Sequence, residues 1–331
     1  MSSLALSGRA SNQPALSALG SQVGVSESAL SFIHVQRSST AMTKGSVADR
    51  FRQDGFSVIP EAISAELLSE LRGLCDKRLA EQGQAHFDAF KFHGSMLELD
   101  PYLDETTRRL ITNQRTIEGL HRIGFRDPKW LSGYQISKPP GGPPLWWHQD
   151  WWAWDESCSF DEVPPQIFVM YYLRDVDENN GALRVIPGSH RRPHRLHSVL
   201  PPAHSAEMNE AAEEGTAHER QPDEITIRAR AGDAVVGDVR LLHATHRNSD
   251  SSRRTCLTLW YLPAFRELPE SIQAYVVEHP AQPERGWWRD PDTEVPEVLR
   301  DLLPVYDGPA EPAQYNREPP LEWAGQVRST R

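Results

Sequence analysis

The stretch Leu145–Trp154, LWWHQDWWAW, contains five of the ten tryptophans in the chain. Its aromatic content predicts a β-strand, since aromatic side chains favour strands. Successive side chains of a strand point to opposite faces, so alternate positions share a face. In this stretch those positions are Trp146, His148, Asp150 and Trp152. An imidazole and a carboxylate would therefore face the same space.

A His-x-Asp pair needs one more histidine to form the 2-His-1-carboxylate triad that holds non-haem Fe(II) and leaves coordination positions open. The candidate is His243, 95 residues after His148. His246 is the competitor, but an odd separation from His243 turns it to the other face of a strand. The alternative for His148 and Asp150 is an aromatic strand in which the two side chains only hydrogen-bond each other.

The 331-residue chain has a formal net charge of −11, with 38% hydrophobic and 24% charged residues. This balance is that of a globular protein, and it argues against nucleic acid or an anionic membrane as a partner. The three cysteines are too few and too widely spaced for a disulfide framework or a zinc site, which predicts a reduced, cytoplasmic setting. We expect a small-molecule substrate and a monomer or small homo-oligomer.

Residues 1–45 are rich in Ser, Ala and Gly and predict a flexible N-terminal tail, with a transit peptide as the weaker alternative. Residues 46–331 are expected to form a single domain. Its first part predicts helices, one of them capped by Ser64 and another covering 104–123 in pieces. Two more helices are expected near the C-terminus, at 269–277 and 294–303.

Between these helical flanks, residues of about 130–263 show the patterns of strands separated by turn signals. Because the strands follow the helices and do not alternate with them, they predict a mainly β, cupin-like jelly roll, the double-stranded β-helix. Asn179-Asn180-Gly181 predicts a hairpin turn. Residues 191–225 predict an irregular loop. The expected strands are 130–138, 145–154, 166–176, 182–186, 224–228, 233–237, a short one at His243, and 254–262.

Several motifs occur in an order that resembles the phytanoyl-CoA dioxygenase family of Fe(II)- and 2-oxoglutarate-dependent oxygenases. The resemblance covers roughly residues 50–265. It implies a double-stranded β-helix with iron at the mouth of the barrel, held by His148, Asp150 and His243, and with 2-oxoglutarate and O2 as cosubstrates. The motifs are Asp54-Gly55-Phe56, His148-Gln149-Asp150, Ile186-Pro187-Gly188-Ser189-His190, Gly232-Asp233 ahead of His243, Asn248-Ser249, and Arg254 eleven residues after His243.

The resemblance also implies residues for the cosubstrate. Arg254 would pair with the distal carboxylate of 2-oxoglutarate, which suits the planar donor fork of a guanidinium. Arg253 is the competitor, but alternation sends it to the opposite face. Thr245 would donate its hydroxyl to the same carboxylate, and Gln135 and Lys138 resemble family positions near the cosubstrate.

Trp146, Trp152 and Trp154 are candidates for an apolar wall at the substrate, the alternative being that they belong to the barrel core. The expected reaction decarboxylates 2-oxoglutarate to succinate and CO2 and hydroxylates, or otherwise oxidises, a metabolite. Family halogenases have a small residue where this chain has Asp150, so halogenation is not expected. The alternative function is a non-catalytic jelly roll that binds a sugar or metabolite, which would have no need for the complete set of His148, Asp150, His243 and Arg254.

Overall fold

The computed structural model describes residues 46–278 and 294–319. These residues all lie within one compact unit. The predicted N-terminal tail, residues 1–45, lies outside the described residues.

The helices confirm the predicted flanks. Ser64 caps α2, and its hydroxyl accepts a hydrogen bond from the backbone of Leu67. The predicted helical stretch 104–123 consists of two helices. No helix of the described ranges is long and apolar enough to cross a membrane. The helices are α1 (Val47–Asp54), α2 (Ala65–Ala80), α3 (Gln84–Ala89), α4 (Glu105–Ile111), α5 (Gln114–Ile123), α6 (Ala206–Asn209), α7 (Glu270–Glu278) and α8 (Glu297–Arg300).

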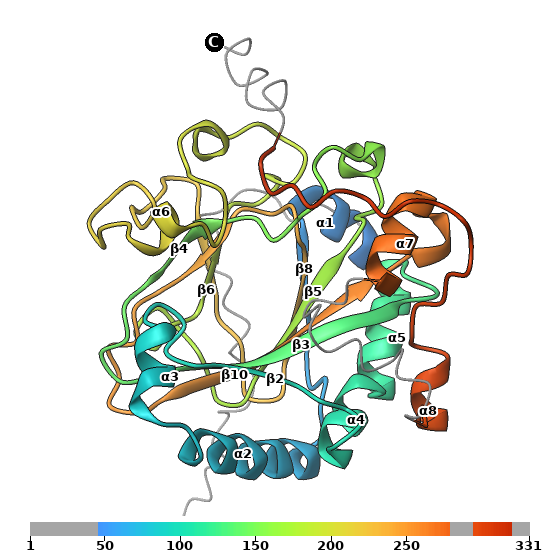
Figure 1. Ribbon diagram of the computed structural model, residues 1–331. Coiled ribbons are helices and arrows are strands. Elements are labelled where there is room, and N and C mark those ends of the chain that lie inside the picture. Colours follow the sequence, from blue (N-terminus) through green and yellow to red (C-terminus); the bar gives the residue numbers. More distant parts are fainter. Residues whose placement is uncertain (1–45, 279–293, 320–331) are drawn as a thin grey trace, which may run out of the picture. The chain divides into compact units, whose positions relative to one another are not determined.

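The strands form two antiparallel sheets that face each other, which confirms the double-stranded β-helix (Figure 1). The larger sheet has the order β1-β8-β5-β10-β3-β2, and the smaller one has the order β4-β9-β6-β7. The strands are β1 (Phe56–Ile59), β2 (Met96–Glu98), β3 (Lys129–Lys138), β4 (Leu145–His148), β5 (Ile167–Tyr172), β6 (Leu183–Val185), β7 (Ile225–Ile227), β8 (Ala234–Asp238), β9 (His243–Thr245) and β10 (Arg254–Leu262).

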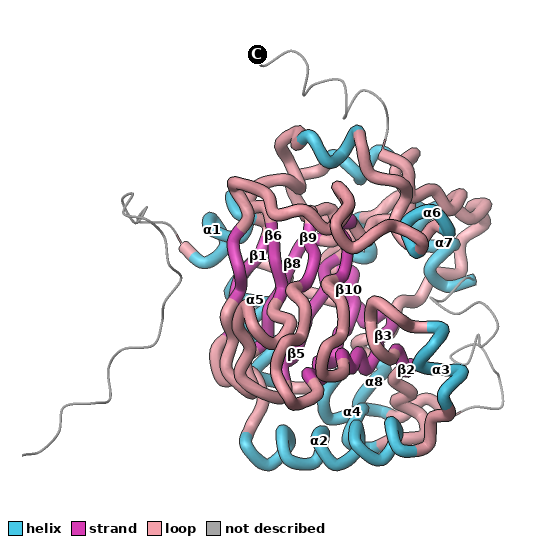
Figure 2. Tube along the Cα trace, turned by 90° about the vertical axis from the view of Figure 1, so that its left-hand side faces the viewer, coloured by secondary structure: helices cyan, strands magenta, loops and turns pink. Residues whose placement is uncertain are grey.

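Alternation along β10 separates the helix-covered face of the larger sheet from the face that looks into the barrel. Leu257 and Leu259 belong to the apolar cluster that also holds residues of α2, α4 and α5. Figure 2 shows α2 and α4 gathered on one side of the strands. Arg254, Cys256 and Thr258, at the intervening positions, line a cavity between the sheets. Helix packing on the outer face thus fixes which side chains reach the interior.

Two expectations about the strands were wrong. The strand expected over 145–154 ends at His148, where the pairing of β4 with β9 shifts register and the chain leaves the sheet. The Asn-Asn-Gly turn does not close a hairpin, because β5 lies in the larger sheet and β6 in the smaller one. The turn instead carries the chain between the sheets, with Gly181 at a φ of 85°. A side chain at Gly181 would also meet the guanidinium of Arg254, because its Cβ would lie 3.2 Å from Nε.

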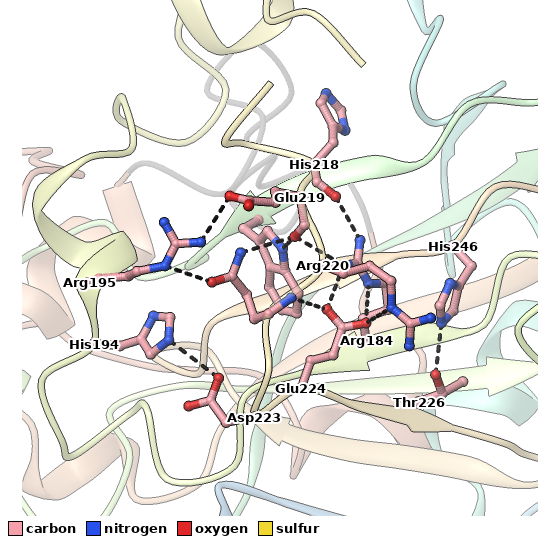
Figure 3. A network of polar contacts seen from close by, with 12 residues as sticks. Arg184, His194, Arg195, His218, Glu219, Arg220, Asp223, Glu224, Thr226 and His246 are labelled. Carbon is pink, nitrogen blue, oxygen red and sulfur yellow. Dashed lines mark hydrogen bonds and ion pairs between the residues drawn. The ribbon is translucent and has the colours of Figure 1, made fainter. Parts of the chain in front are cut away.

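A buried polar network ties the long loop before β7 to the smaller sheet (Figure 3). Arg184 of β6 forms an ion pair with Glu224, and both side chains are only 3% exposed. The same guanidinium donates to the carbonyls of His218 and Glu219, and it lies 4.6 Å from the ring of Trp147. One cation therefore holds the end of the loop against β4 and β6.

We expect Glu224→Ala to lower the free energy of unfolding by about 3–5 kcal/mol, because it leaves the buried Arg184 charge without its carboxylate. The matched control is Glu178→Ala, which breaks a far more exposed pair with Arg228 and should cost less than about 1 kcal/mol. Urea unfolding of both variants measures the difference. Similar, small losses in the two variants would show that the buried pair does not anchor the loop.

Candidate active site

Three metal-capable side chains meet where β4 and β9 run side by side. His148 ends β4 and is paired with His243, which begins β9, so their rings lie 4.0 Å apart. Asp150 follows two residues later, with one carboxylate oxygen 3.4 Å from His148 Nε2 and the other 3.7 Å from His243 Nε2. One ligand atom from each residue lies within 4.8 Å of the others. The structure thus brings the predicted triad together.

The hydrogen bonds of the two imidazoles test whether this set fits a metal. Nδ1 of His148 lies 3.0 Å from the carbonyl oxygen of Trp146, and Nδ1 of His243 lies 2.9 Å from that of Leu241. A carbonyl only accepts, so each Nδ1 carries the hydrogen and each Nε2 presents a lone pair. Two lone pairs and a carboxylate then converge with no proton between them. A divalent cation satisfies this arrangement, and backbone acceptors of this kind orient metal-binding histidines.

The protonation states of the triad agree with metal binding. Burial, together with neighbouring His148, lowers the pKa of His243 to about 4, which keeps its imidazole neutral near pH 7. Burial opposes ionisation of Asp150, but its polar contacts with His148 and His204 outweigh that effect and hold its pKa well below the usual value. The site therefore offers a neutral imidazole and an anionic carboxylate, as Fe(II) prefers.

Trp260 of β10 supports the carboxylate from the opposite sheet. Its indole nitrogen lies 3.3 Å from the Asp150 oxygen that faces His243, and it donates a hydrogen bond to it. Trp260 packs edge-on against Tyr134 of β3, which fixes the ring. Neither residue was among the sequence-based candidates. This donor restrains the only acidic member of the triad.

We expect Trp260→Phe to weaken Fe(II) binding about tenfold, since loss of a hydrogen bond to a metal ligand typically costs that much. The control is Trp151→Phe, which also removes a buried indole donor but one that binds Ser159. Anaerobic Fe(II) titration compares the two variants with the unmodified protein. Equal affinity in Trp260→Phe and the unmodified protein would mean that the contact does not position Asp150.

The triad opens into a cavity of about 530 Å³ between the sheets. Two buried cations, Lys138 and Arg254, lie side by side in its wall, each 1% exposed. The ammonium of Lys138 donates to the hydroxyl of Thr245 at 2.8 Å. Burial, with Arg254 nearby, lowers the pKa of Lys138 well below its usual value. Thr245 also lines the cavity, on the same face of β9 as His243.

Arg254 has no carboxylate partner among the described residues. Its guanidinium donates a weak hydrogen bond from Nη1 to the sulfur of Cys256 at 3.0 Å, and Nε is buried without an acceptor in the described part of the chain. A guanidinium in that state favours an anion in the cavity. Arg253 faces away, donating to the Ser137 carbonyl over the ring of Phe87, and His246 faces away to hydrogen-bond Thr226. The strand register used to choose Arg254 and His243 is therefore the one in the structure.

Three of the sequence-based candidates lie elsewhere than expected. Gln135 points to the outer face of β3, where it donates to the Cys75 carbonyl of α2, so it is not a cavity residue. Trp154 is buried in the barrel core and does not line the cavity. Trp146 packs edge-on against the His148 ring, 4.6 Å away, without lining the cavity. Trp152 does line it, stacked on Tyr275.

Other cavity residues were missed from the sequence. His204, in the loop predicted over residues 191–225, lies 4.0 Å from an Asp150 oxygen, and its ring stacks on that of His93. The positive φ of His204, 63°, turns the chain just before α6. Tyr315 and Arg317 come from the C-terminal segment. No local pattern marks these residues, because each is brought in by contacts far along the chain.

A double-stranded β-helix with two histidines and one carboxylate beside its cavity is the arrangement found in non-haem iron enzymes. Residues 51–256 match the sequence model of the phytanoyl-CoA dioxygenase family. The chain therefore belongs to that family. The protein is thus an Fe(II)- and 2-oxoglutarate-dependent dioxygenase, which decides against the alternative of a non-catalytic binding protein.

Individual relatives agree with this assignment. The ectoine dioxygenase of Nocardia farcinica is 25% identical over 252 residues, which cover 68% of this chain and 79% of the relative. The ectoine dioxygenase of Stutzerimonas stutzeri is 23% identical over 262 residues, which cover 72% of this chain and 81% of the relative.

Two solved structures share the fold. HygX from Streptomyces hygroscopicus, with nickel and 2-oxoglutarate bound, has a TM-score of 0.51 at 16% identity and covers 68% of this chain and 89% of its own. The epimerase SnoN, in complex with Fe3+, alpha ketoglutarate and nogalamycin RO, has a TM-score of 0.50 at 19% identity. The match covers 79% of this chain and 94% of the SnoN chain.

Proposed function

We propose that this dioxygenase hydroxylates, or otherwise oxidises, a small-molecule metabolite while 2-oxoglutarate is converted to succinate and CO2. The observation that carries the proposal is the convergence of the unshared lone pairs of His148 and His243 with the Asp150 carboxylate on the wall of the cavity between the sheets. The cavity volume of about 530 Å³ has to hold both 2-oxoglutarate and the substrate. It therefore suits a metabolite and not a polymer.

The polar side chains in the cavity would each have a distinct role in binding iron or 2-oxoglutarate. His148, Asp150 and His243 would hold Fe(II), which together with 2-oxoglutarate and O2 supplies the oxidation of an unactivated C–H bond. Arg254 would pair with the distal carboxylate of 2-oxoglutarate, and Thr245 would donate its hydroxyl to it. Lys138 would add a donor beside them and hold Thr245 in place. Lys138, Arg254 and Thr245 are all buried, and a contact between buried charged or polar groups is stronger than the same contact in water.

Anaerobic addition of Fe(II) and 2-oxoglutarate to the purified protein tests the proposal. We expect the weak visible charge-transfer band of the iron chelate, and succinate once air is admitted. A screen of metabolites for those that stimulate succinate release would then identify the substrate. Absence of both the band and succinate would remove the proposal. A chlorinated product in the presence of chloride would contradict the role of Asp150 as a metal ligand.

A further inference from the structure

Arg317 brings a third cation to the cavity wall, and it takes no part in the 2-oxoglutarate site proposed above. Its Nε donates to the hydroxyl of Tyr315, and its guanidinium lies 5.5 Å from the centre of the Tyr315 ring. Nη1 is buried and has no hydrogen-bond acceptor among the residues that the structure describes. Within residues 46–278 and 294–319, no carboxylate lies within ion-pair distance of Arg317. A partly buried guanidinium without a carboxylate partner is stabilised when an anion accepts its hydrogen bonds.

The segment that carries Arg317 is fixed to the chain just after the metal ligand Asp150. The backbone N–H of Asn316 donates to the carbonyl of Trp152 at 2.7 Å, and its own carbonyl accepts from the N–H of Trp154 at 3.2 Å. In Figure 1 this red segment follows α8 and runs past α7. These two bonds set the position of Arg317 relative to the triad.

An aromatic wall stands beside Arg317. Trp152 stacks on Tyr275 of α7 with ring centres 4.2 Å apart, and the ring of Tyr315 lies nearly parallel to Trp152, 6.4 Å away. Trp152 is held by a hydrogen bond from its indole to Gln166 at 3.0 Å. Flat, apolar surfaces of this kind bind the body of a ligand, while a charged group nearby sets its orientation.

The charges in the cavity also favour an anionic substrate. Among the described residues that line it, Asp150 is the only acidic one, whereas Lys138, Arg254 and Arg317 are basic. A divalent metal, Asp150, dianionic 2-oxoglutarate and Arg254 together have no net charge, so Arg317 leaves the loaded cavity positive whether or not Lys138 is protonated. The whole chain carries −11, so this positive charge is a local feature.

We infer that the substrate is an organic acid, whose carboxylate pairs with Arg317 while its apolar body packs on the wall of Trp152, Tyr275 and Tyr315. This inference rests on the proposed function and adds the chemical class of the substrate. The family match ends at residue 256, so Arg317, Tyr315 and Tyr275 all lie beyond it. The selectivity for an acid would therefore belong to the C-terminal part of this chain.

Binding of matched acids and amides tests the inference. The probes are indole-3-acetate and indole-3-acetamide, 2-naphthoate and 2-naphthamide, and cyclohexanecarboxylate and its amide. Calorimetry under argon measures their binding to the full-length protein with Fe(II) and 2-oxoglutarate. We expect at least one acid to bind more tightly than its amide. Arg317→Gln should weaken that acid about 10- to 100-fold and leave the amide within about twofold, while Arg317→Lys keeps part of the preference.

The control is Arg266→Gln, which removes a guanidinium that is 80% exposed and should leave the preference intact. The inference is overturned if no acid of the panel binds better than its amide, or if Arg317→Gln keeps the full preference. The chelate band of the unmodified protein, recorded without any probe, distinguishes a failure of the proposed function from a failure of the inference about the substrate. A missing band contradicts the proposed function itself, whereas a normal band without preference for acids contradicts only the inference about the substrate.

Discussion

Asp150→Ala is expected to abolish product formation and to weaken Fe(II) binding at least about 100-fold. Asp150 is the only acidic side chain that the described residues contribute to the cavity lining, and it faces both triad histidines within 3.7 Å. Its removal leaves two neutral imidazoles to hold a divalent cation, and it opens a coordination position to water or halide. Anaerobic Fe(II) titration and succinate release measure the two effects separately.

Two further variants make this result specific. Asp150→Asn keeps the shape of the side chain and removes its charge, so it should also lose iron if the charge is what matters. Asp155→Ala removes an exposed carboxylate five residues along the chain and should leave both iron binding and turnover unchanged. Retention of normal Fe(II) affinity and turnover by Asp150→Ala would show that the metal ligands have been misassigned.

Strand alternation predicted most of the site because β9 and β10 are each paired with a neighbouring strand on both sides. His243 and Thr245 share one face of β9, and His246 lies on the other. The same rule selected Arg254 over Arg253 on β10. These choices depend only on the alternation of side chains between the two faces of a strand, which is maintained where the strand is paired with neighbours on both sides.

The same rule shows why Gln135 and Lys138 could not both serve the cosubstrate. They are three positions apart on β3, an odd separation, so only one of them can face the cavity. Lys138 does, while Gln135 reaches the carbonyl of Cys75 on the helical side. In the aromatic run, by contrast, alternation fails after His148, because the strand ends there. Asp150 is placed instead by its backbone N–H, which donates to the Val239 carbonyl at 2.7 Å.

The rest of the site depends on contacts between distant parts of the chain. Trp260 reaches Asp150 across the barrel, and His204 arrives on a loop that is held through Arg184 at its far end. Arg317 is positioned by the backbone bonds of Asn316 to the residues around Ala153. No periodicity or motif near these residues encodes such contacts, so the sequence alone could not place Trp260, His204 or Arg317 in the cavity.

Arg254→Ala is expected to lower the apparent affinity for 2-oxoglutarate about 30- to 1000-fold. The physical reason is the loss of a charge-assisted, two-pronged contact in a desolvated pocket, worth roughly 2–4 kcal/mol. Arg254 is 1% exposed and lacks an acidic partner among the described residues, so the substitution breaks no ion pair within that part of the protein. The iron ligands should stay in place. Titration with 2-oxoglutarate, followed by the chelate band, measures the loss.

Arg253→Ala is the matched control, because it removes the neighbouring guanidinium from the opposite face of the sheet. Arg253 donates to the Ser137 carbonyl and lies over Phe87, so its loss should affect stability slightly and 2-oxoglutarate little. Arg254→Lys should recover part of the affinity, since it keeps the charge without the fork. Suppose instead that Arg253→Ala lost its affinity for 2-oxoglutarate and Arg254→Ala kept nearly normal affinity. The cosubstrate would then lie on the other face of β10, and the roles proposed for Arg254 and Thr245 would both be wrong.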